Sequence, residues 1–331
     1  MKIIKVFIIL FLLFYKNVYA IDVSFESWKN NFKKVAIKNG ISESTYNLVM
    51  KDVIFLPKVI KYDRFQPEFY EDTKTYVSKR TSANKVIKGK KLYLKNKKLI
   101  NSVEKKFFVE KELLLALMGI ETNFGTYVGK MDILSSLSTL SFDKRRSDFF
   151  TNELLTLIQL IDKNLIDHRV LYGSWAGAFG YFQFMPTTIM NYALDYNDNN
   201  VIELKEIEDS FASAANYINK IGWKEKSPCY KKIELSKKIP KKYLNTSAKK
   251  IINKKKIIFF KDFIIDYENY NFDDDEIVGI ITPDKDIVKN SDDLNPAFIV
   301  YQNYELILKW NRSLRFALAV CNLKDKFSNE L

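Results

Sequence analysis

Glu121 is the acid in this sequence whose setting most clearly allows chemistry. It directly follows the apolar run 113–120, which predicts a helix that is buried on most faces. A carboxylate at the end of such a helix is costly unless a partner or a reaction uses it, and burial raises the pKa of a carboxyl group. A carboxylic acid with a raised pKa can protonate a glycosidic oxygen near neutral pH. Taken alone, residues 121–125 fit equally well a structural Glu that is paired with Lys or Arg.

A second segment, residues 173–186, has the composition of a carbohydrate-binding loop. Its sequence is Gly-Ser-Trp-Ala-Gly-Ala-Phe-Gly-Tyr-Phe-Gln-Phe-Met-Pro. Glycines let a backbone approach a ligand closely, and aromatic side chains offer flat apolar faces that suit sugar rings. Ser174 and Gln183 can form hydrogen bonds with hydroxyl and acetamido groups. Because core packing alone does not require this mixture, the segment favours a sugar-binding site.

Together, these two segments resemble the membrane-bound lytic murein transglycosylase B family. The shared patterns are Glu-Thr-x-x-Gly at 121–125 and Gly-Ser-x-Ala-Gly-Ala-x-Gly-x-x-Gln-Phe-Met-Pro at 173–186. Further similar stretches are 133–142, 145–154, 215–217, 222–223 and 310–320. The resemblance covers most of 111–223 and the C-terminal helix, and it is weak over 224–297.

The resemblance implies a lysozyme-like helical core with a goose-type catalytic Glu. It implies cleavage of the β-1,4 bond between N-acetylmuramic acid (MurNAc) and N-acetylglucosamine (GlcNAc), with formation of a 1,6-anhydro-MurNAc end. By position, Glu121 is the general acid and then the base. The implied substrate-binding residues are Ser174, Gln183, Phe184, Met185, Tyr217, Trp310 and Asn311. The family often has Tyr where this chain has Trp310 and Phe316, and the hydroxyl missing at 316 affects a detail of substrate positioning rather than the chemistry.

A single carboxylate is enough for the implied reaction. Glycoside hydrolases usually need a second Asp or Glu as nucleophile or base, and no second acid lies within 121–125 or 173–186. A MurNAc residue supplies its own nucleophiles, because its acetamido oxygen stabilises the developing cation and its C6 hydroxyl then attacks. Two other functions fit the same residues: a non-catalytic peptidoglycan-binding or scaffold protein, and a hydrolytic muramidase that leaves reducing ends.

Residues 195–209 carry oxygen atoms at alternate positions, as in an EF-hand loop. The candidate ligands are Asp195, Asn197, Asn199, the backbone carbonyl of Val201, and either Glu206 or Asp209. Asn200 replaces the usual turn glycine, which is tolerable because Asn adopts the left-handed conformation. The family resemblance includes such a loop, with Asp209 as its late acid, and implies structural Ca2+, whereas the chemistry needs no cofactor. The alternative is an acidic loop that leads into the next helix.

The N-terminal residues predict export. Residues 1–20 combine Lys2 and Lys5, the apolar run 6–15 and a final Ala20, as in a cleavable signal peptide, and no Cys follows to carry a lipid anchor. Removal of this segment lowers the formal net charge from +13 to +10, because it also contains Lys16. A basic exported protein meets anionic wall polymers rather than nucleic acid, although the lysines could equally be solvated on helix faces. We expect a periplasmic monomer whose partner is peptidoglycan, and leave open peripheral contacts with the membrane or cell-wall proteins.

The histidine and cysteine content limits other chemistries. His168 is the single histidine of the sequence, and without a Cys cluster it argues against a catalytic zinc site. Cys229 and Cys321 could form a disulfide in an exported protein. A free buried thiol also fits Cys321, which follows the apolar run 316–320.

The elements that must position these residues are mainly helical, so the expected fold class is mainly α (α+β). Helices are expected over most of 24–103 and at 110–120, 147–162, 186–192, 209–221 and 310–323. Short strands are expected at 232–235, 257–260, 276–281 and 298–301. The expected plan is a signal peptide 1–20, an N-terminal helical region 21–105, a lysozyme-like catalytic core 106–223, a β-rich insertion 224–305, and a C-terminal helix 306–331 that returns to the core.

Overall fold

The chain is divided into two compact units. The computed structural model describes residues 24–65, 71–285, 287–289, 291–292 and 294–331, so the predicted signal peptide lies outside the described residues. Unit 1 comprises 1–65, 128–191 and 197–204, and unit 2 comprises 66–127, 192–196 and 205–331. None of the helices in the described ranges is long and apolar enough to cross a membrane.

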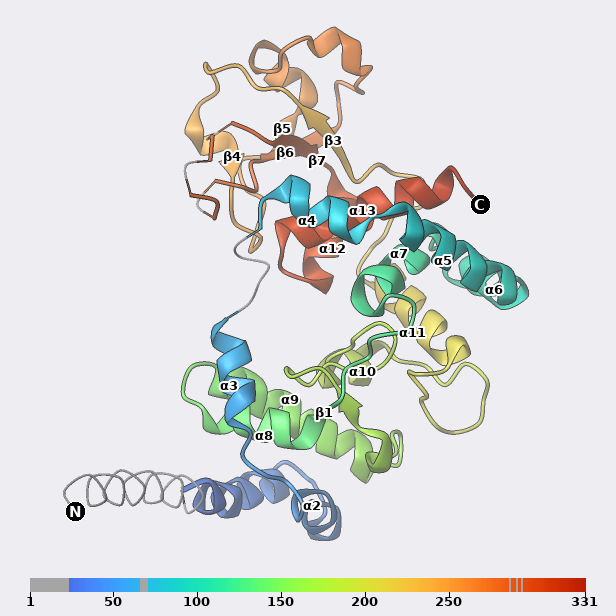
Figure 1. Cartoon of the computed structure of the whole chain (residues 1–331), viewed down its shortest axis with the longest axis vertical. Helices are drawn as coiled ribbons and strands as arrows, with labels where there is room; N and C mark the ends of the chain where they lie inside the picture. The colour runs from blue at the N-terminus through green and yellow to red at the C-terminus, as the bar shows by residue number, and fades with distance from the viewer. Residues whose placement is uncertain (1–23, 66–70, 286, 290, 293) are drawn as a thin grey trace, which may run out of the picture. The chain divides into compact units, whose positions relative to one another are not determined.

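Unit 1 is helical and packs around one apolar helix. Its helices include one over 24–38, α2 (Glu43–Met50), α3 (Pro57–Arg64), α8 (Ile133–Phe142), α9 (Ser147–Asp162) and most of α10 (Pro186–Tyr192). Two short strands, β1 (Met131–Asp132) and β2 (Tyr172–Gly173), pair antiparallel in the same unit. Residues 133–141 of α8 are all buried, and α8 lies beside α9 and α3 (Figure 1). The first helix carries a stacked aromatic series, since Phe25 stacks on Trp28 and Trp28 on Phe32 with centroids 5.4 and 5.2 Å apart.

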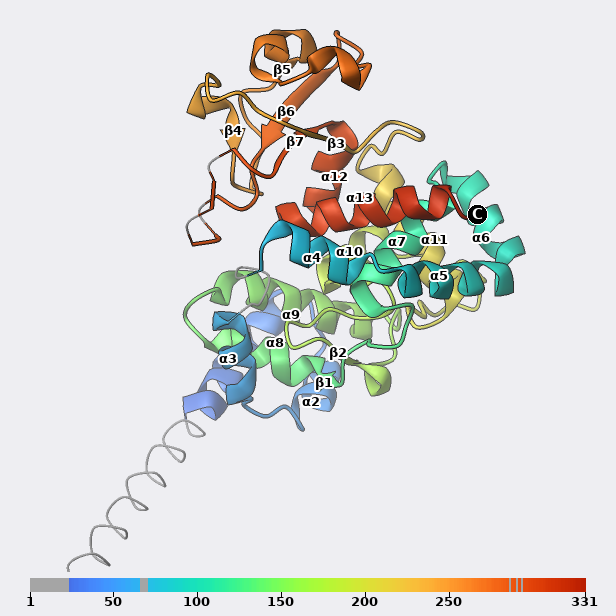
Figure 2. The same ribbon diagram turned by 45° about the horizontal axis from the view of Figure 1, so that its top comes forward.

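Unit 2 carries the second helical group, built around α7. Its helices are α4 (Thr73–Arg80), α5 (Ala83–Lys95), α6 (Lys97–Phe107), α7 (Lys111–Thr122), α11 (Ile207–Lys220), α12 (Gln302–Trp310) and α13 (Leu314–Ser328). Residues 113–119 of α7 are buried, as the uninterrupted apolar run predicts. Helix α13 lies along α7 and α4 (Figure 2), so the last helix of the chain forms part of the core around α7.

The predicted β-rich segment also belongs to unit 2. Its sheet has the order β3 (Tyr230–Ile233), β7 (Ala297–Val300), β6 (Ile277–Ile281) and β4 (Leu244–Asn245), and β5 (Lys255–Lys256) pairs with β6. The β3–β7, β6–β7 and β5–β6 pairs are antiparallel, whereas β4 and β6 are parallel. Short 3-10 helices, η3 (Lys241–Tyr243), η4 (Ile257–Phe263) and η5 (Tyr267–Tyr270), cover a core that includes Ile233, Phe260 and Val278.

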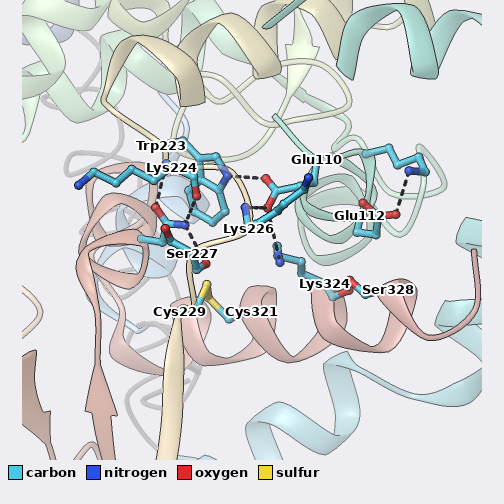
Figure 3. Close-up of polar contacts among 12 residues, drawn as sticks. Glu110, Glu112, Trp223, Lys224, Lys226, Ser227, Cys229, Cys321, Lys324 and Ser328 are labelled. Atoms are coloured by element: carbon cyan, nitrogen blue, oxygen red, sulfur yellow. Dashed lines mark hydrogen bonds and ion pairs between the residues drawn. A yellow bond between two sulfur atoms is a disulfide. The ribbon is translucent and has the colours of Figure 1, made fainter. Parts of the chain in front are cut away.

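A polar network and a disulfide fix the segment that leads from α11 into the sheet. Figure 3 shows Glu110 at the start of α7, where its carboxylate accepts hydrogen bonds from Trp223 Nε1 (2.5 Å) and from the backbone N–H of Lys226 (2.9 Å). Lys324 Nζ of α13 lies 3.7 Å from the same carboxylate. The open question of the two thiols is answered by a Cys229–Cys321 disulfide, with a Cα–Cα distance of 6.1 Å.

Several predicted elements are confirmed, whereas one predicted strand and the start of one predicted helix are wrong. Helices α9 and α10 have the predicted bounds. Residues 257–260 are not a strand but the start of η4, because Ile257 and Phe260 are buried three residues apart, which is the 3-10 period. The helix predicted at 310–323 begins later, as α13 at Leu314, because Trp310 ends α12. The Ser313 side chain accepts a hydrogen bond from the Phe316 N–H as the cap of α13.

The predicted domains were consecutive segments, whereas the compact units interleave segments of the chain. Residues 106–223, expected to be one catalytic core, are shared between the two units. Residues 224–305, expected to be an insertion, lie wholly in unit 2 together with α12 and α13.

Candidate active site

Glu121 lies in the last turn of α7 and is half-buried. The helix ends sharply after it, because Asn123, Phe124 and Gly125 all have positive φ values of 50°, 60° and 78°. The Thr122 hydroxyl accepts a hydrogen bond from the Gly125 N–H at 3.0 Å and closes this turn. The Glu-Thr-x-x-Gly pattern therefore describes a fixed helix end that holds the carboxylate, with glycine at the third left-handed position.

Close packing reinforces the same turn. A Cβ atom added to Gly119 would lie 2.7 Å from the ring of Phe124, and one added to Gly89 of α5 would lie 2.9 Å from it. The ring also meets Phe327 of α13 edge-on, with centroids 6.4 Å apart. The turn is thus clamped between α5, α7 and α13, and this limits the positions that the Glu121 backbone can adopt.

A row of three aromatic rings ends at the Glu121 carboxylate. Tyr192 stacks on Tyr217 at 4.4 Å, and Tyr217 stacks on Trp310 at 5.1 Å. Trp310 Nε1 then donates a hydrogen bond to Glu121 Oε1 at 2.9 Å. The contacts join the end of α10, the middle of α11 and the end of α12 to α7, so predicted site residues from three distant parts of the sequence lie together in unit 2.

Tyr217 is the central ring of this row and is held at both ends. It is only 9% exposed, and its hydroxyl donates to the Lys309 carbonyl at 3.2 Å. Burial, together with the neighbouring Tyr192, raises the pKa of Tyr217 to about 12, so the phenol stays protonated and a donor at neutral pH. Tyr192 was not predicted as a site residue. Its position at the end of a helix that directly follows 173–186 was the only indication in the sequence.

Asn311 and Phe316 lie on either side of the break between α12 and α13. Asn311 has an extended backbone, and its carbonyl accepts a hydrogen bond from the Ser313 N–H at 2.8 Å. Its partly exposed position beside Trp310 fits the predicted role in substrate binding, which stays a prediction. Phe316 is only 4% exposed, so the ring that replaces the family's Tyr lies in the core of unit 2.

The second predicted motif lies in unit 1 and folds into a compact double turn. The Ser174 hydroxyl accepts hydrogen bonds from the N–H groups of Ala176 (3.3 Å) and Ala178 (2.9 Å). Phe179 and Phe184 exchange two backbone hydrogen bonds of 2.9 Å each. The Gln183 amide donates to the carbonyls of Gly180 (2.8 Å) and Val128 (3.3 Å). Most of the hydrogen bonds that stabilise this motif are therefore formed within the motif itself.

The glycines of this motif serve the fold, which differs from the expected role in approaching a ligand. A Cβ at Gly173 would lie 2.2 Å from the Ala178 carbonyl, one at Gly177 2.5 Å from Leu137, and one at Gly180 2.5 Å from Leu204. Phe184 is 3% exposed and contributes mainly to the core, whereas Ser174, Gln183 and Met185 are partly exposed. The role of these residues in binding sugar stays a prediction.

A family model described as "Transglycosylase SLT domain" matches residues 24–325. The chain belongs to this transglycosylase family. The match includes α7, the 173–186 motif, α12 and most of α13, which are the parts that carry the residues described above.

Individual members of the transglycosylase family are similar to this chain. The membrane-bound lytic murein transglycosylase B of Escherichia coli (strain K12) is 38% identical over 125 residues, which are 38% of this chain and 35% of that protein, so the match spans about a third of the length of the curated relative. The structure of SltB3 from Pseudomonas aeruginosa in complex with NAG-anhNAM-pentapeptide is similar with a TM-score of 0.80 and 26% identity, covering 92% of this chain and 79% of that one.

A further solved structure extends the similarity of fold. The lytic transglycosylase Slt35 of Escherichia coli in complex with calcium has a TM-score of 0.75 at 23% identity, covering 91% of this chain and 93% of that one. The mainly α fold predicted for this chain is therefore that of the lytic transglycosylases.

The predicted calcium loop of this transglycosylase has the local geometry of such a loop in part. Asn200 adopts the left-handed conformation, with φ of 69°, where an EF-hand has glycine. The side-chain oxygens of Asn197 and Asn199 accept hydrogen bonds from the backbone two residues later. Asp209 accepts one from the Tyr196 N–H at 2.8 Å. No group of three or more His, Cys, Asp or Glu side chains that could hold a metal occurs in the described ranges, and the binding of calcium stays a prediction.

Glu153, a buried acid of unit 1, has a structural role. Glu153 of α9 is 2% exposed, and its two oxygens accept hydrogen bonds from the N–H (2.9 Å) and hydroxyl (2.7 Å) of Thr187 at the start of α10. Burial raises the pKa of Glu153, although the bonds from Thr187 oppose the shift. Glu153 thus fixes the chain that follows Met185, whereas Glu121 is the acid that is joined to the aromatic row.

Proposed function

We propose that this protein is a lytic transglycosylase that cleaves the β-1,4 bond between MurNAc and GlcNAc in bacterial peptidoglycan and leaves 1,6-anhydro-MurNAc ends. The observation that supports it most strongly is the hydrogen bond from Trp310 to Glu121 at the end of the row Tyr192–Tyr217–Trp310. It couples the single candidate acid to flat aromatic faces of the kind that bind sugars, in a chain that belongs to the transglycosylase family.

In the proposed mechanism, Glu121 first gives its proton to the glycosidic oxygen that links MurNAc to the next GlcNAc. The bond from that oxygen to C1 of MurNAc breaks, and the acetamido oxygen of the same sugar stabilises the positive charge at C1. Glu121, now a carboxylate, removes the proton from the C6 hydroxyl as its oxygen bonds to C1. One group therefore acts as acid and then as base.

The other predicted residues take supporting roles in this proposal. Trp310 orients the carboxylate through its N–H, and Tyr217 keeps the indole in place by stacking. Asn311 in unit 2, and Ser174, Gln183 and Met185 in unit 1, bind the glycan. The loop 195–209 takes up Ca2+ as a structural ion, supported by the left-handed Asn200. Residues 1–20 direct the chain to the periplasm, where it acts as a monomer.

Mass spectrometry of digested sacculi tests the function and separates it from its alternatives. Native protein should release muropeptides with anhydro ends, whereas a hydrolytic muramidase would release reducing ends and a scaffold protein would release nothing. Glu121→Gln keeps the shape of the side chain and removes the acid, so we expect a rate loss of at least ~100-fold. Glu112→Gln, on the same helix and beside Lys111, is the matched control and should keep the native rate. Near-native release by folded Glu121→Gln would overturn the mechanism.

A further inference from the structure

A lysine of α5 contacts the end of the helix that carries Glu121. Lys85 Nζ donates a hydrogen bond of 2.5 Å to the carbonyl oxygen of Gly119, two residues before Glu121 in α7. The same oxygen accepts the N–H of Asn123, the first residue beyond the helix, at 3.2 Å. Lys85 is partly buried, so this contact is shielded from solvent in part. The mechanism proposed above does not use this lysine.

One face of α5 holds the chain on both sides of Glu121. Helix α5 lies beside α7 (Figure 2), and Lys85 and Gly89 are four residues apart, which places them on the same face of α5. Lys85 binds the carbonyl of residue 119, and Gly89 leaves space for the ring of Phe124, since an added Cβ would lie 2.9 Å from that ring. The last turn of α7 is therefore fixed before and after the acid.

The position of Glu121 in the last turn of α7 makes its charged form costly. The carbonyl groups at the C-terminal end of a helix carry a partial negative charge, which repels an anion and attracts a cation. Glu121 becomes an anion when it gives its proton to the glycosidic oxygen. A cation at the Gly119 carbonyl lowers the free energy of that anion, because it offsets the charge of the helix end. The Lys85 ammonium occupies this position.

Lys85 keeps its charge at neutral pH. Burial, followed by the cations Arg80 and Lys88, lowers the pKa of Lys85 to about 8. Lys326 of α13 is a further cation of this region, and it donates to the backbone carbonyl of Thr81, four residues before Lys85. Because a pKa of about 8 lies above neutral pH, the ammonium form of Lys85 predominates there.

We propose that Lys85 is a positioning residue of the transglycosylase reaction, which fixes the end of α7 and stabilises the carboxylate that Glu121 becomes after proton donation. The inference rests on the proposed function and adds to it a residue that acts through the Gly119 carbonyl rather than on the sugar. Trp310 orients the carboxylate directly, whereas Lys85 sets the charge of the helix end that carries it.

The test compares how kcat depends on pH in native protein and in three variants. Glu121 must be protonated to begin the reaction, so kcat falls on the alkaline side. Lys85→Met removes the cation, and we expect kcat to fall about tenfold and the alkaline midpoint of the profile to rise by about half a pH unit. Lys85→Arg keeps a cationic donor and should restore the native midpoint. Lys91→Met, which removes an exposed lysine of the same helix, is the matched control and should behave as native protein.

The alkaline midpoint separates a role in catalysis from a role in folding. Removal of a merely structural lysine would lower kcat and the melting temperature without moving the midpoint, and that result would overturn the proposal. A midpoint in Lys85→Arg as high as that in Lys85→Met would overturn it too, because the positive charge would then have no effect. If Lys85→Met does not fold, Lys85→Gln, which removes the charge and keeps an N–H donor, should show the same rise.

A second measurement distinguishes failure of this inference from failure of the proposed function. If native protein forms no anhydro ends, the proposed function fails and there is no kcat to follow. Titration of the Glu121 carboxyl by NMR in the folded protein still measures the charge effect. We expect its midpoint to be about half a pH unit higher in Lys85→Gln than in native protein. Equal midpoints refute the proposal.

Discussion

The indole N–H of Trp310 contacts the carboxylate of Glu121 at 2.9 Å, although 189 positions separate the two residues in the sequence. The contact exists because α13 lies along α7 and α12 is joined to α13 by the short turn 311–313. A donor held at this distance fixes the orientation of the carboxylate, which is a requirement for efficient proton transfer.

Trp310→Phe should therefore lower kcat clearly and change the melting temperature only slightly. The substitution keeps a ring that can stack on Tyr217 and removes the N–H, and we expect a loss of about tenfold in kcat with a small change in melting temperature. Trp223→Phe is the matched control, since it removes an indole N–H from another glutamate, Glu110. That control should lower the melting temperature and leave kcat near the native value. The reverse pattern would refute an orienting role for Trp310.

Reduction of the Cys229–Cys321 disulfide should destabilise unit 2. The bridge closes a loop of 92 residues, for which chain entropy predicts a contribution of about 4–5 kcal/mol to the free energy of unfolding. Denaturant titration with and without a reductant measures it. The Cys229→Ser/Cys321→Ser double variant should be as unstable as reduced native protein and should not respond to the reductant. Equal stability of reduced and oxidised native protein would contradict the prediction.

The raised pKa of Glu153 predicts how stability depends on pH. Because the folded pKa lies above the ordinary value of 4.5, the unfolded chain loses this proton first as pH rises. The stability contributed by protonated Glu153 is complete below about pH 4.5 and is lost as pH rises through the folded pKa. Glu153→Gln removes this loss. The melting temperature of the variant should therefore rise relative to that of the native protein as pH increases from about 4.5 through the folded pKa of Glu153. A melting-temperature difference between variant and native protein that is constant from pH 4 to 7 would contradict this role of Glu153.

Calcium should raise the melting temperature if the loop 195–209 binds it, because only the folded loop presents the ligands together. We expect the shift to require up to millimolar calcium, since Asn at 197 and 199 lowers the negative charge of the loop. Asp195→Ala should abolish the shift, whereas Asp198→Ala, in the same loop but outside the predicted ligands, should retain it. Absence of any shift in native protein would identify the loop as a polar connection.

The sequence was sufficient to predict an element where its apolar residues follow one clear period or form one uninterrupted run. Helix α9 has its predicted bounds because its apolar period is regular, and α7 is buried because residues 113–120 are apolar on every face. The segment 257–260 was predicted wrongly because four apolar residues in succession do not distinguish a strand from a 3-10 turn. Only the buried pair Ile257 and Phe260 reveals the period.

The candidate site was predictable to the extent that its residues belong to motifs. Glu121, Tyr217 and Trp310 were predicted and lie together. Tyr192 was missed because stacking depends on how α10 and α11 pack, which no local pattern encodes. Phe184 was expected to line the groove, and its burial follows from its backbone pairing with Phe179, a contact between residues whose roles the motif does not distinguish.

The late position of Trp310 in the sequence has a consequence for biosynthesis. The ribosome makes Glu121 before it makes Trp310, so a nascent chain that has not yet reached α12 contains the acid without the group that orients it. The carboxylate acquires its partner only after α12 has been made. A fragment that ends anywhere before Trp310 should therefore be a poor catalyst, because it lacks the indole N–H that orients the carboxylate.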